Sequence, residues 1–164
     1  MQKIILILLL VFPLNLLAQE DPGCYQKKDF LLIQSTKNYD SAWRTAREAA
    51  KYFSIPLDLR DLVPVNKSSV GLTFPPDSCL LYSMEEEGTA NSTCYLARGR
   101  WDDGLYISIE YSNAYDGFAK GYYIVMAGNA DKKDPALVLT LKRLKSKYAD
   151  AYIKTSTVYL CCMH

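Results

Sequence analysis

The stretch YYIVMAGNADKKDPALVLTLKRLKSKYADAYI, residues 122–153, decides the fold more than any other part of the sequence. Its first seven residues are apolar or small and predict a buried strand. Asp134 can cap a helix with Pro135 in its first position. That helix has one apolar face, formed by Leu137, Leu141, Leu144 and Tyr148. Because residues 150–160 then alternate as a strand does, the stretch predicts a strand–helix–strand unit.

The same order of elements occurs earlier, in FLLIQSTKNYDSAWRTAREAAKYFSIPLDL, residues 30–59. Contiguous apolar residues predict a strand, and Asp40 can cap the helix that follows it. This helix also has one apolar face, formed by Ala42, Ala46, Ala49, Ala50 and Phe53. The alternating residues 55–65 predict the returning strand.

Two such units in one sheet predict an α+β fold. Each helix has a single apolar face, so each can cover only one face of the sheet. We therefore expect an antiparallel sheet with two helices packed on one face, in the order βαβ–insertion–βαβ. The insertion, at about 64–120, is expected to be β-rich. Its residues 64–104 are rich in Pro, Gly, Ser and acidic residues. Within it, residues 102–111 alternate most clearly between apolar and polar side chains.

The N-terminus indicates export. Lys3 precedes an apolar run that ends near Ala18, which is the layout of a secretory signal peptide over residues 1–19. A retained membrane anchor is the alternative, but the run is shorter than a membrane-spanning helix needs. We expect a polar leader over residues 20–28, a single domain over residues 29–164, and a periplasmic or extracellular bacterial protein with no membrane span after cleavage.

The charge balance argues against nucleic-acid binding. The chain has 19 basic and 18 acidic residues, and removal of the signal peptide takes one lysine, Lys3, which leaves 18 of each. Nucleic-acid binding normally requires a basic surface. The chain also has 13 tyrosines and 2 tryptophans. Such residues suit carbohydrate and protein interfaces, and they equally suit half-buried strands.

Five cysteines remain after export, and disulfides are the default outside the cytoplasm. Cys79 and Cys94 can close the loop between them, and Cys24 can reach Cys161 or Cys162. An odd count leaves one thiol free or available for a second chain. The C-terminal sequence CCMH contains soft metal ligands, but adjacent cysteines on a strand point to opposite faces. We therefore expect a disulfide there and no metal site.

The two halves resemble the SPOR family of bacterial cell-envelope modules. In the second half, Tyr122, Tyr123, Val125 and Gly128 follow one another as in that family, before a polar loop and an amphipathic helix. In the first half Gln34 fits, although residues 35–36 stand where a glycine is expected. The resemblance implies a βαββαβ fold that binds peptidoglycan glycan strands on an exposed sheet face, without catalysis or a cofactor.

The candidate ligand-binding residues come from the predicted strands and from the segment RGRWDDG, residues 98–104, where arginine and tryptophan adjoin acids. They are Gln34, Arg98, Trp101, Tyr106, Tyr122 and Tyr123. Catalysis by an oriented imidazole is not expected, because the only histidine is the terminal His164. Paired acids near Trp101 leave an enzyme open as a third hypothesis.

The sequence thus favours an exported, non-catalytic binding domain for cell-wall glycan. The alternative is a disulfide-stabilised secreted interaction or inhibitor domain that binds an envelope protein or another partner through the insertion. In neither case do we expect a cofactor.

Overall fold

The computed structural model of the chain describes residues 22–67, 70–75 and 94–161. The predicted signal peptide and the positions of Cys79, Cys162 and His164 lie outside these ranges. The strands are β1 (Tyr25–Thr36), β2 (Val63–Lys67), β3 (Val70–Thr73), β4 (Ser108–Tyr111), β5 (Tyr123–Asp131) and β6 (Tyr152–Tyr159). The α-helices are α1 (Tyr39–Phe53) and α3 (Pro135–Leu144), and two short 3-10 helices are η1 (Pro22–Cys24) and η2 (Ser112–Ala114).

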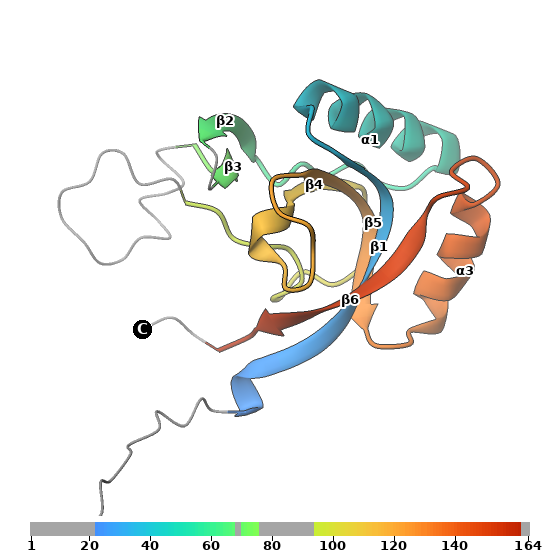
Figure 1. The fold of residues 1–164 in the computed structure, drawn as a ribbon. Coiled ribbons are helices and arrows are strands. Elements are labelled where there is room, and N and C mark those ends of the chain that lie inside the picture. The colour runs from blue at the N-terminus through green and yellow to red at the C-terminus, as the bar shows by residue number, and fades with distance from the viewer. Residues whose placement is uncertain (1–21, 68–69, 76–93, 162–164) are drawn as a thin grey trace, which may run out of the picture.

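The main sheet has four strands in the order β4-β5-β1-β6, and each strand is antiparallel to its neighbours. Figure 1 shows a strongly curved sheet with α1 and α3 along its outer side. The side chains of Leu31 and Ile33 on β1, and of Val125 and Ala127 on β5, form one buried cluster with the apolar faces of both helices. The predicted α+β fold with both helices on one face of an antiparallel sheet is therefore confirmed.

Both helices begin at capping side chains. Asp134 caps α3, since its carboxylate accepts a hydrogen bond from the backbone N–H of Ala136 at 2.7 Å. The predicted cap at Asp40 is wrong, because the helix begins at Tyr39 and its N-cap is Asn38. The Asn38 side chain accepts a hydrogen bond from the backbone N–H of Ser41 at 2.8 Å.

The returning strand of the first unit differs from the prediction. Residues 55–62 contain Pro56 and several charges, and they form only an isolated parallel bridge, between Leu57 and Ile107. The chain then turns through left-handed conformations at Arg60 and Asp61 into β2, which pairs with β3 in a separate two-stranded sheet. The strand that returns to the main sheet is β4, so the long connection lies between α1 and β4. The resulting strand order is that of a split βαβ, or ferredoxin-like, arrangement.

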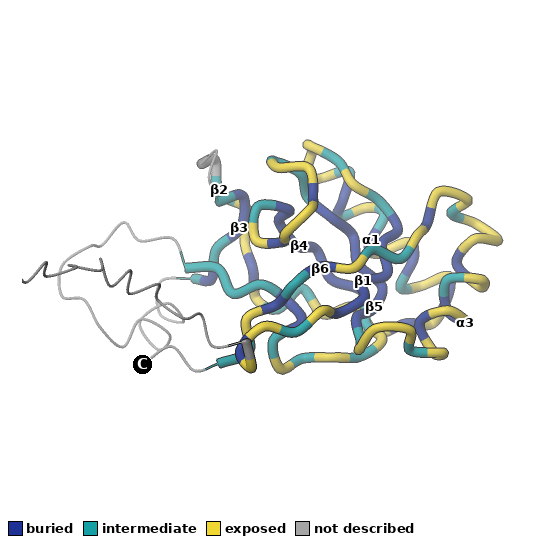
Figure 2. Tube along the Cα trace, turned by 60° about the horizontal axis from the view of Figure 1, so that its bottom comes forward, coloured by how far each residue is buried: buried dark blue, intermediate teal, exposed yellow. Residues whose placement is uncertain are grey.

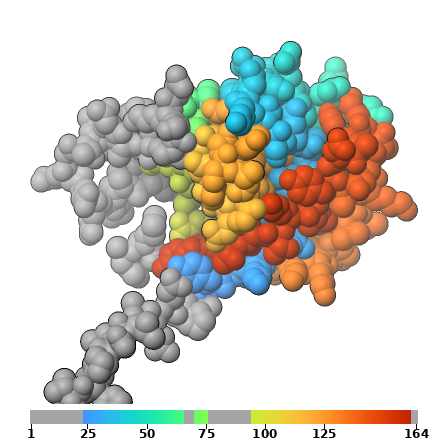
Figure 3. Space-filling model, in the orientation of Figure 1, coloured from blue at the N-terminus to red at the C-terminus, as the bar shows by residue number. Residues whose placement is uncertain are grey.

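The sheet face opposite the helices is largely covered. Phe30 and Leu32 of β1 and Ile124 and Met126 of β5 are buried in a second apolar cluster that also contains Tyr115, Phe118 and Val158. In Figure 3 the residues that follow β4, in yellow-orange, lie against β6, in red, and the tube in Figure 2 is dark blue along most of the sheet. The exposed sheet face implied by the family resemblance is therefore not present over most of its area.

The segment before β4 covers the same face, and its residues 94–97 have no regular secondary structure. Gly99 allows a close approach there. Its φ is +104°, and a Cβ atom at this position would lie 2.8 Å from the Phe30 ring. The chain can therefore cross directly over β1 only with glycine at residue 99.

A disulfide joins Cys24 and Cys161, whose Cα atoms are 5.0 Å apart. It links the start of β1 to the end of β6, and it confirms the predicted bond between Cys24 and one of the C-terminal cysteines. β1 begins directly after Cys24, so part of the expected polar leader belongs to the sheet. Cys94 is also disulfide-bonded, and the proposed partner Cys79 lies outside the described residues.

Candidate functional site

A network of buried polar side chains centres on Glu110 of β4, which is fully buried. Its carboxylate accepts hydrogen bonds from Arg60 at 3.0 Å, from the Tyr95 hydroxyl at 2.6 Å and from the Tyr115 hydroxyl at 3.2 Å. Arg60 also donates to the carbonyl of Leu96 at 3.0 Å. Four separate parts of the chain therefore meet at one carboxylate.

The same contacts shift the pKa values of the network. Burial, and then the Glu110 carboxylate, raise the pKa of Tyr95 and of Tyr115 above the usual tyrosine value. Burial lowers the pKa of Arg60, but the carboxylates of Glu110 and Asp102 outweigh it and the net shift is upward. These groups are held in their ordinary protonation states, with the tyrosines neutral and the arginine charged.

Arg98, a predicted ligand-binding residue, belongs to this buried network and is fully buried. Its guanidinium donates to the Asn129 side chain at 2.6 Å, to the Ser108 hydroxyl at 2.9 Å and to the carbonyls of Tyr106 and Gly104 at 2.9 and 2.8 Å. A ligand cannot reach it without displacing the covering segment. Arg98 therefore fixes that segment to the sheet, and the expectation of ligand contact is corrected.

Tyr106 and the acids near it are also engaged. The Arg98 guanidinium carbon lies 3.4 Å from the centroid of the Tyr106 ring, and the Tyr106 hydroxyl donates to Asp102 at 3.0 Å. Asp103 accepts from Lys28 at 2.6 Å and from Asn129 at 2.5 Å. Tyr106 was predicted to bind a ligand, and the acids near Trp101 were considered as a catalytic pair; in the structure all three side chains make contacts within the fold.

Gln34 and Tyr123 point away from the covered face. The pairing of β1 with β5 shifts register between Leu32 and Gln34, so the alternation that puts Phe30 on the covered face does not extend to Gln34. The Gln34 amide donates instead to Ser41 of α1 at 3.4 Å. The Tyr123 ring packs against Tyr39 and Tyr111, and its hydroxyl donates to the Gly71 carbonyl at 3.2 Å.

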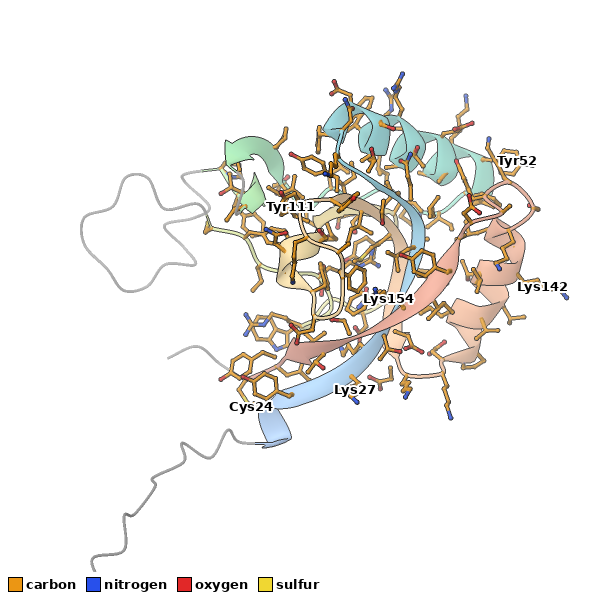
Figure 4. All side chains as sticks on the ribbon, viewed as in Figure 1. Cys24, Lys27, Tyr52, Tyr111, Lys142 and Lys154 are labelled. Carbon is orange, nitrogen blue, oxygen red and sulfur yellow. A yellow bond between two sulfur atoms is a disulfide. The ribbon has the colours of Figure 1, made fainter. Side chains whose placement is uncertain are left out.

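Tyr122 lies on the opposite face from Tyr123 and lines a pocket of about 160 Å³. The pocket lies between the loop after β4 and the starting ends of β5 and β6. It is lined by Ser35, Ser112, Phe118, Ala119, Tyr122, Ile124, Tyr152 and Lys154. Figure 4 shows Lys154 on β6, facing the viewer. This pocket is the candidate functional site, and of the predicted ligand-binding residues it contains Tyr122.

The chemistry of the pocket combines aromatic walls, hydroxyl groups and positive charge. Tyr122 is half-buried and Tyr152 is 43% exposed, while Phe118 and Ile124 form a buried apolar base. The Lys154 ammonium lies 4.6 Å from the Phe118 ring centroid. A second ammonium group, that of Lys37, lies 5.4 Å from the centroid of the Tyr122 ring. None of the eight lining residues is acidic.

Sequence reasoning missed most of these lining residues. Phe118 lies in a segment that reads as a turn, and Ser35 replaces Gln34 on this face only because of the register shift in β1. Lys154 is one of several lysines in the chain, and no local sequence motif marks it as a binding residue. The alternation of β6 is the one pattern that could have found it, because it places Lys154 and Tyr152 on one side of that strand.

Trp101 lies outside the pocket and is 65% exposed. Its neighbour Arg100 donates to the carbonyls of Tyr159 and Cys161, so it extends across the end of β6. Trp101 is the most exposed of the six predicted ligand-binding residues.

The described part of the chain shows neither a cluster of metal ligands nor a helix that could cross a membrane. Within residues 22–67, 70–75 and 94–161, no three His, Cys, Asp or Glu side chains gather as metal ligands do. Neither α1 nor α3 has the length and apolar character that crossing a membrane requires. The disulfide between Cys24 and Cys161 fits an oxidising compartment.

Comparisons with protein-family models, with curated proteins and with solved structures gave no match to this chain.

Proposed function

We propose that this chain is an exported, non-catalytic domain that binds the glycan strands of the bacterial cell wall. The observation that carries the proposal is the pocket that Tyr122, Tyr152 and Lys154 line together. It lies on the sheet face opposite the helices, at the end that the covering segments leave open. The Cys24–Cys161 disulfide supports export, because such bonds persist in oxidising compartments.

The ligand class follows from the lining groups. The apolar face of a sugar ring can stack on a tyrosine, and sugar hydroxyls can exchange hydrogen bonds with Ser35. Peptidoglycan differs from neutral polysaccharides because its stem peptides carry carboxylates, as do its muramic acid residues wherever the peptide has been removed. The ammonium groups of Lys154 and Lys37 provide the matching charge. An acidic glycan therefore fits the pocket better than a neutral one.

A binding role is favoured over catalysis by the state of the acids. Among the described residues, the carboxylates of Glu110, Asp102 and Asp103 are each paired with an arginine or a lysine. None of the three lines the pocket. The accessible groups of the pocket are suited to holding a sugar and provide no acid–base pair.

Retention on purified, protein-free peptidoglycan sacculi tests the proposal. We expect the wild-type chain to be retained, and Tyr122→Ala to weaken retention about tenfold, the loss of roughly 1.4 kcal/mol of stacking. Lys154→Gln should weaken it less and should also reduce its dependence on salt, because one ionic contact is removed.

The matched control is Tyr52→Ala. Tyr52 is 60% exposed, and Figure 4 shows it at the end of α1, away from Lys154. Its loss should leave retention unchanged. If the wild-type chain is not retained, or if all three variants are retained equally, glycan binding at the pocket is refuted, and the alternative of a protein-interaction domain becomes the better proposal.

A further inference from the structure

A group of exposed aromatic side chains lies at the disulfide end of the sheet. Trp101 is 65% exposed, Tyr25 is 45% exposed and Tyr159 is 37% exposed. Arg100 lies between two of them, with its guanidinium carbon 4.7 Å from the Trp101 ring centroid and 5.6 Å from that of Tyr159. We call these four residues the terminal aromatic patch.

Three members of the terminal aromatic patch are held by contacts within the fold. Arg100 donates to the carbonyl of Tyr159 at 2.8 Å and to that of Cys161 at 3.1 Å, which fixes its guanidinium plane. The rings of Tyr25 and Tyr159 are 5.1 Å apart across the β1–β6 pair. The Cys24–Cys161 bond ties the same two strand ends together. Because Arg100, Tyr25 and Tyr159 already make these contacts, little of their rotamer entropy is lost when a ligand stacks on the patch.

The charge around the patch favours the same ligand as the pocket. The two acids that follow Trp101 are both neutralised, Asp102 by Arg60 at 3.4 Å and Asp103 by Lys28 at 2.6 Å. The patch therefore combines aromatic surface with the positive charge of Arg100. This combination repeats the chemistry of Tyr122 and Lys154 in the pocket.

Strand β6 connects the two places. Tyr152 and Lys154, at its start, line the pocket, and Tyr159 is its last residue. Seven residues of strand separate Tyr152 from Tyr159, which corresponds to about 23 Å at about 3.3 Å per residue. Figure 3 shows β6 as a continuous red band on the surface between them. β6 is the edge strand of the main sheet, and its alternation puts Tyr159 on the opposite side of the strand from Tyr152 and Lys154. A glycan several sugars long could cross this edge and reach both places, whereas a disaccharide could not span the distance.

We infer that the terminal aromatic patch is a second stacking subsite for the same glycan strand, with Trp101 as its main contact. The inference rests on the proposed function and adds a requirement for length. Long strands gain affinity from the patch, and short fragments bind at the pocket alone. The patch is formed by the connection between α1 and β4 together with the two strand ends, so it is separate from the pocket.

The test compares the affinity of the full chain for long, purified glycan strands and for a peptidoglycan disaccharide carrying its stem peptide. We expect Trp101→Ala to reduce the affinity for long strands by a factor of about five to ten and to leave the affinity for the disaccharide unchanged. Trp101→Phe should restore most of the loss, because it keeps an aromatic face. In a Trp43→Phe background, the fluorescence of the remaining Trp101 should change with long strands and stay constant with the disaccharide.

The outcomes separate this inference from the proposed function. If Trp101→Ala binds long strands as the wild type does while Tyr122→Ala does not, the second subsite is refuted and the pocket stands. If Trp101→Ala weakens both ligands equally, the length requirement is refuted. If neither variant changes the binding of either ligand, both proposals fail. An unchanged melting temperature of Trp101→Ala, expected for so exposed a side chain, confirms that its fold is intact.

Discussion

Removal of the Glu110 carboxylate should release the covering segments from the sheet. Glu110 is fully buried and holds Arg60, Tyr95 and Tyr115. In Glu110→Ala the guanidinium of Arg60, whose side chain is 11% exposed, loses its buried counter-ion. Both tyrosine hydroxyls lose an acceptor at the same time.

The magnitude follows from these losses. Breaking a buried ion pair by removing one partner costs roughly 3–5 kcal/mol. The hydroxyls add to this only in part, because water can enter the space that the side chain leaves. We therefore expect Glu110→Ala to lower the free energy of unfolding by about 4 kcal/mol, which is a large share of the roughly 5–15 kcal/mol typical of a domain. Glu110→Gln keeps the shape and one acceptor, so we expect a smaller loss of about 2 kcal/mol.

Equilibrium urea unfolding of the oxidised chain, followed by circular dichroism, measures these values. The control is Glu48→Ala, because Glu48 is an exposed acid paired with Lys147 at 2.7 Å and should change the unfolding midpoint little. The double variant with Arg60→Met should lose less than the sum of the single losses, since it leaves no unpaired charge. A loss below about 1 kcal/mol in Glu110→Ala would refute the view that this carboxylate anchors the covering segments.

Two further predictions concern the whole domain. Because burial raises the pKa of Tyr95 and Tyr115 in the folded chain, the unfolded chain loses these protons first, near pH 10, and the free energy of unfolding should fall as pH rises beyond that value. The melting temperature measured as a function of pH tests this. If the melting temperature of Tyr95→Phe falls as steeply with pH as that of the wild type, the prediction is contradicted. Replacing Cys24 and Cys161 together by serine should lower the free energy of unfolding by about 2–4 kcal/mol, measured by urea unfolding, because the bond closes a loop across 137 positions. An unchanged midpoint would show that β1 and β6 hold together without it.

The parts of the fold that were predicted correctly depend on local sequence signals. The apolar face of each helix, the capping of α3 by Asp134 and the alternation of β6 are all properties of short windows. A single apolar face on each helix was also enough to predict that both helices share one side of the sheet.

The errors arose where distant contacts outweigh local pattern. Residues 55–65 alternate as a strand does, but their charged side chains and Pro56 suit a surface segment, and Arg60 turns inward to meet Glu110. β4 has only four residues and carries Glu110 into the core, which a pattern of apolar alternation does not predict. The partners of Glu110 are Arg60, which lies in a turn, and Tyr95, which lies in the irregular segment before β4. The sequence around neither residue indicates that it binds a buried carboxylate.

The site was predictable only in part for the same reason. Tyr122 follows from the alternation of β5, and Trp101 from its unusual position next to arginine and acids. Gln34 was misplaced because one irregular pairing in β1 moves every later side chain to the other face. Phe118 reaches the pocket through packing of a loop against β6, which depends on the tertiary fold alone.

The distribution of polar groups explains why the open part of the sheet face lies where it does. Ser108 and Glu110 of β4 are buried on that face and must be satisfied, so the segments carrying Arg98 and Tyr115 are fixed over them. The pocket lies beside this network, at the starting ends of β5 and β6, and the loop after β4 contributes Ser112, Phe118 and Ala119 to its lining. Variants of the Glu110 network should therefore lose binding only as they lose the fold, whereas Tyr122→Ala should lose binding at an unchanged melting temperature. Equal loss of both properties in Tyr122→Ala would show that the pocket is part of the core and is not a separate surface for a ligand.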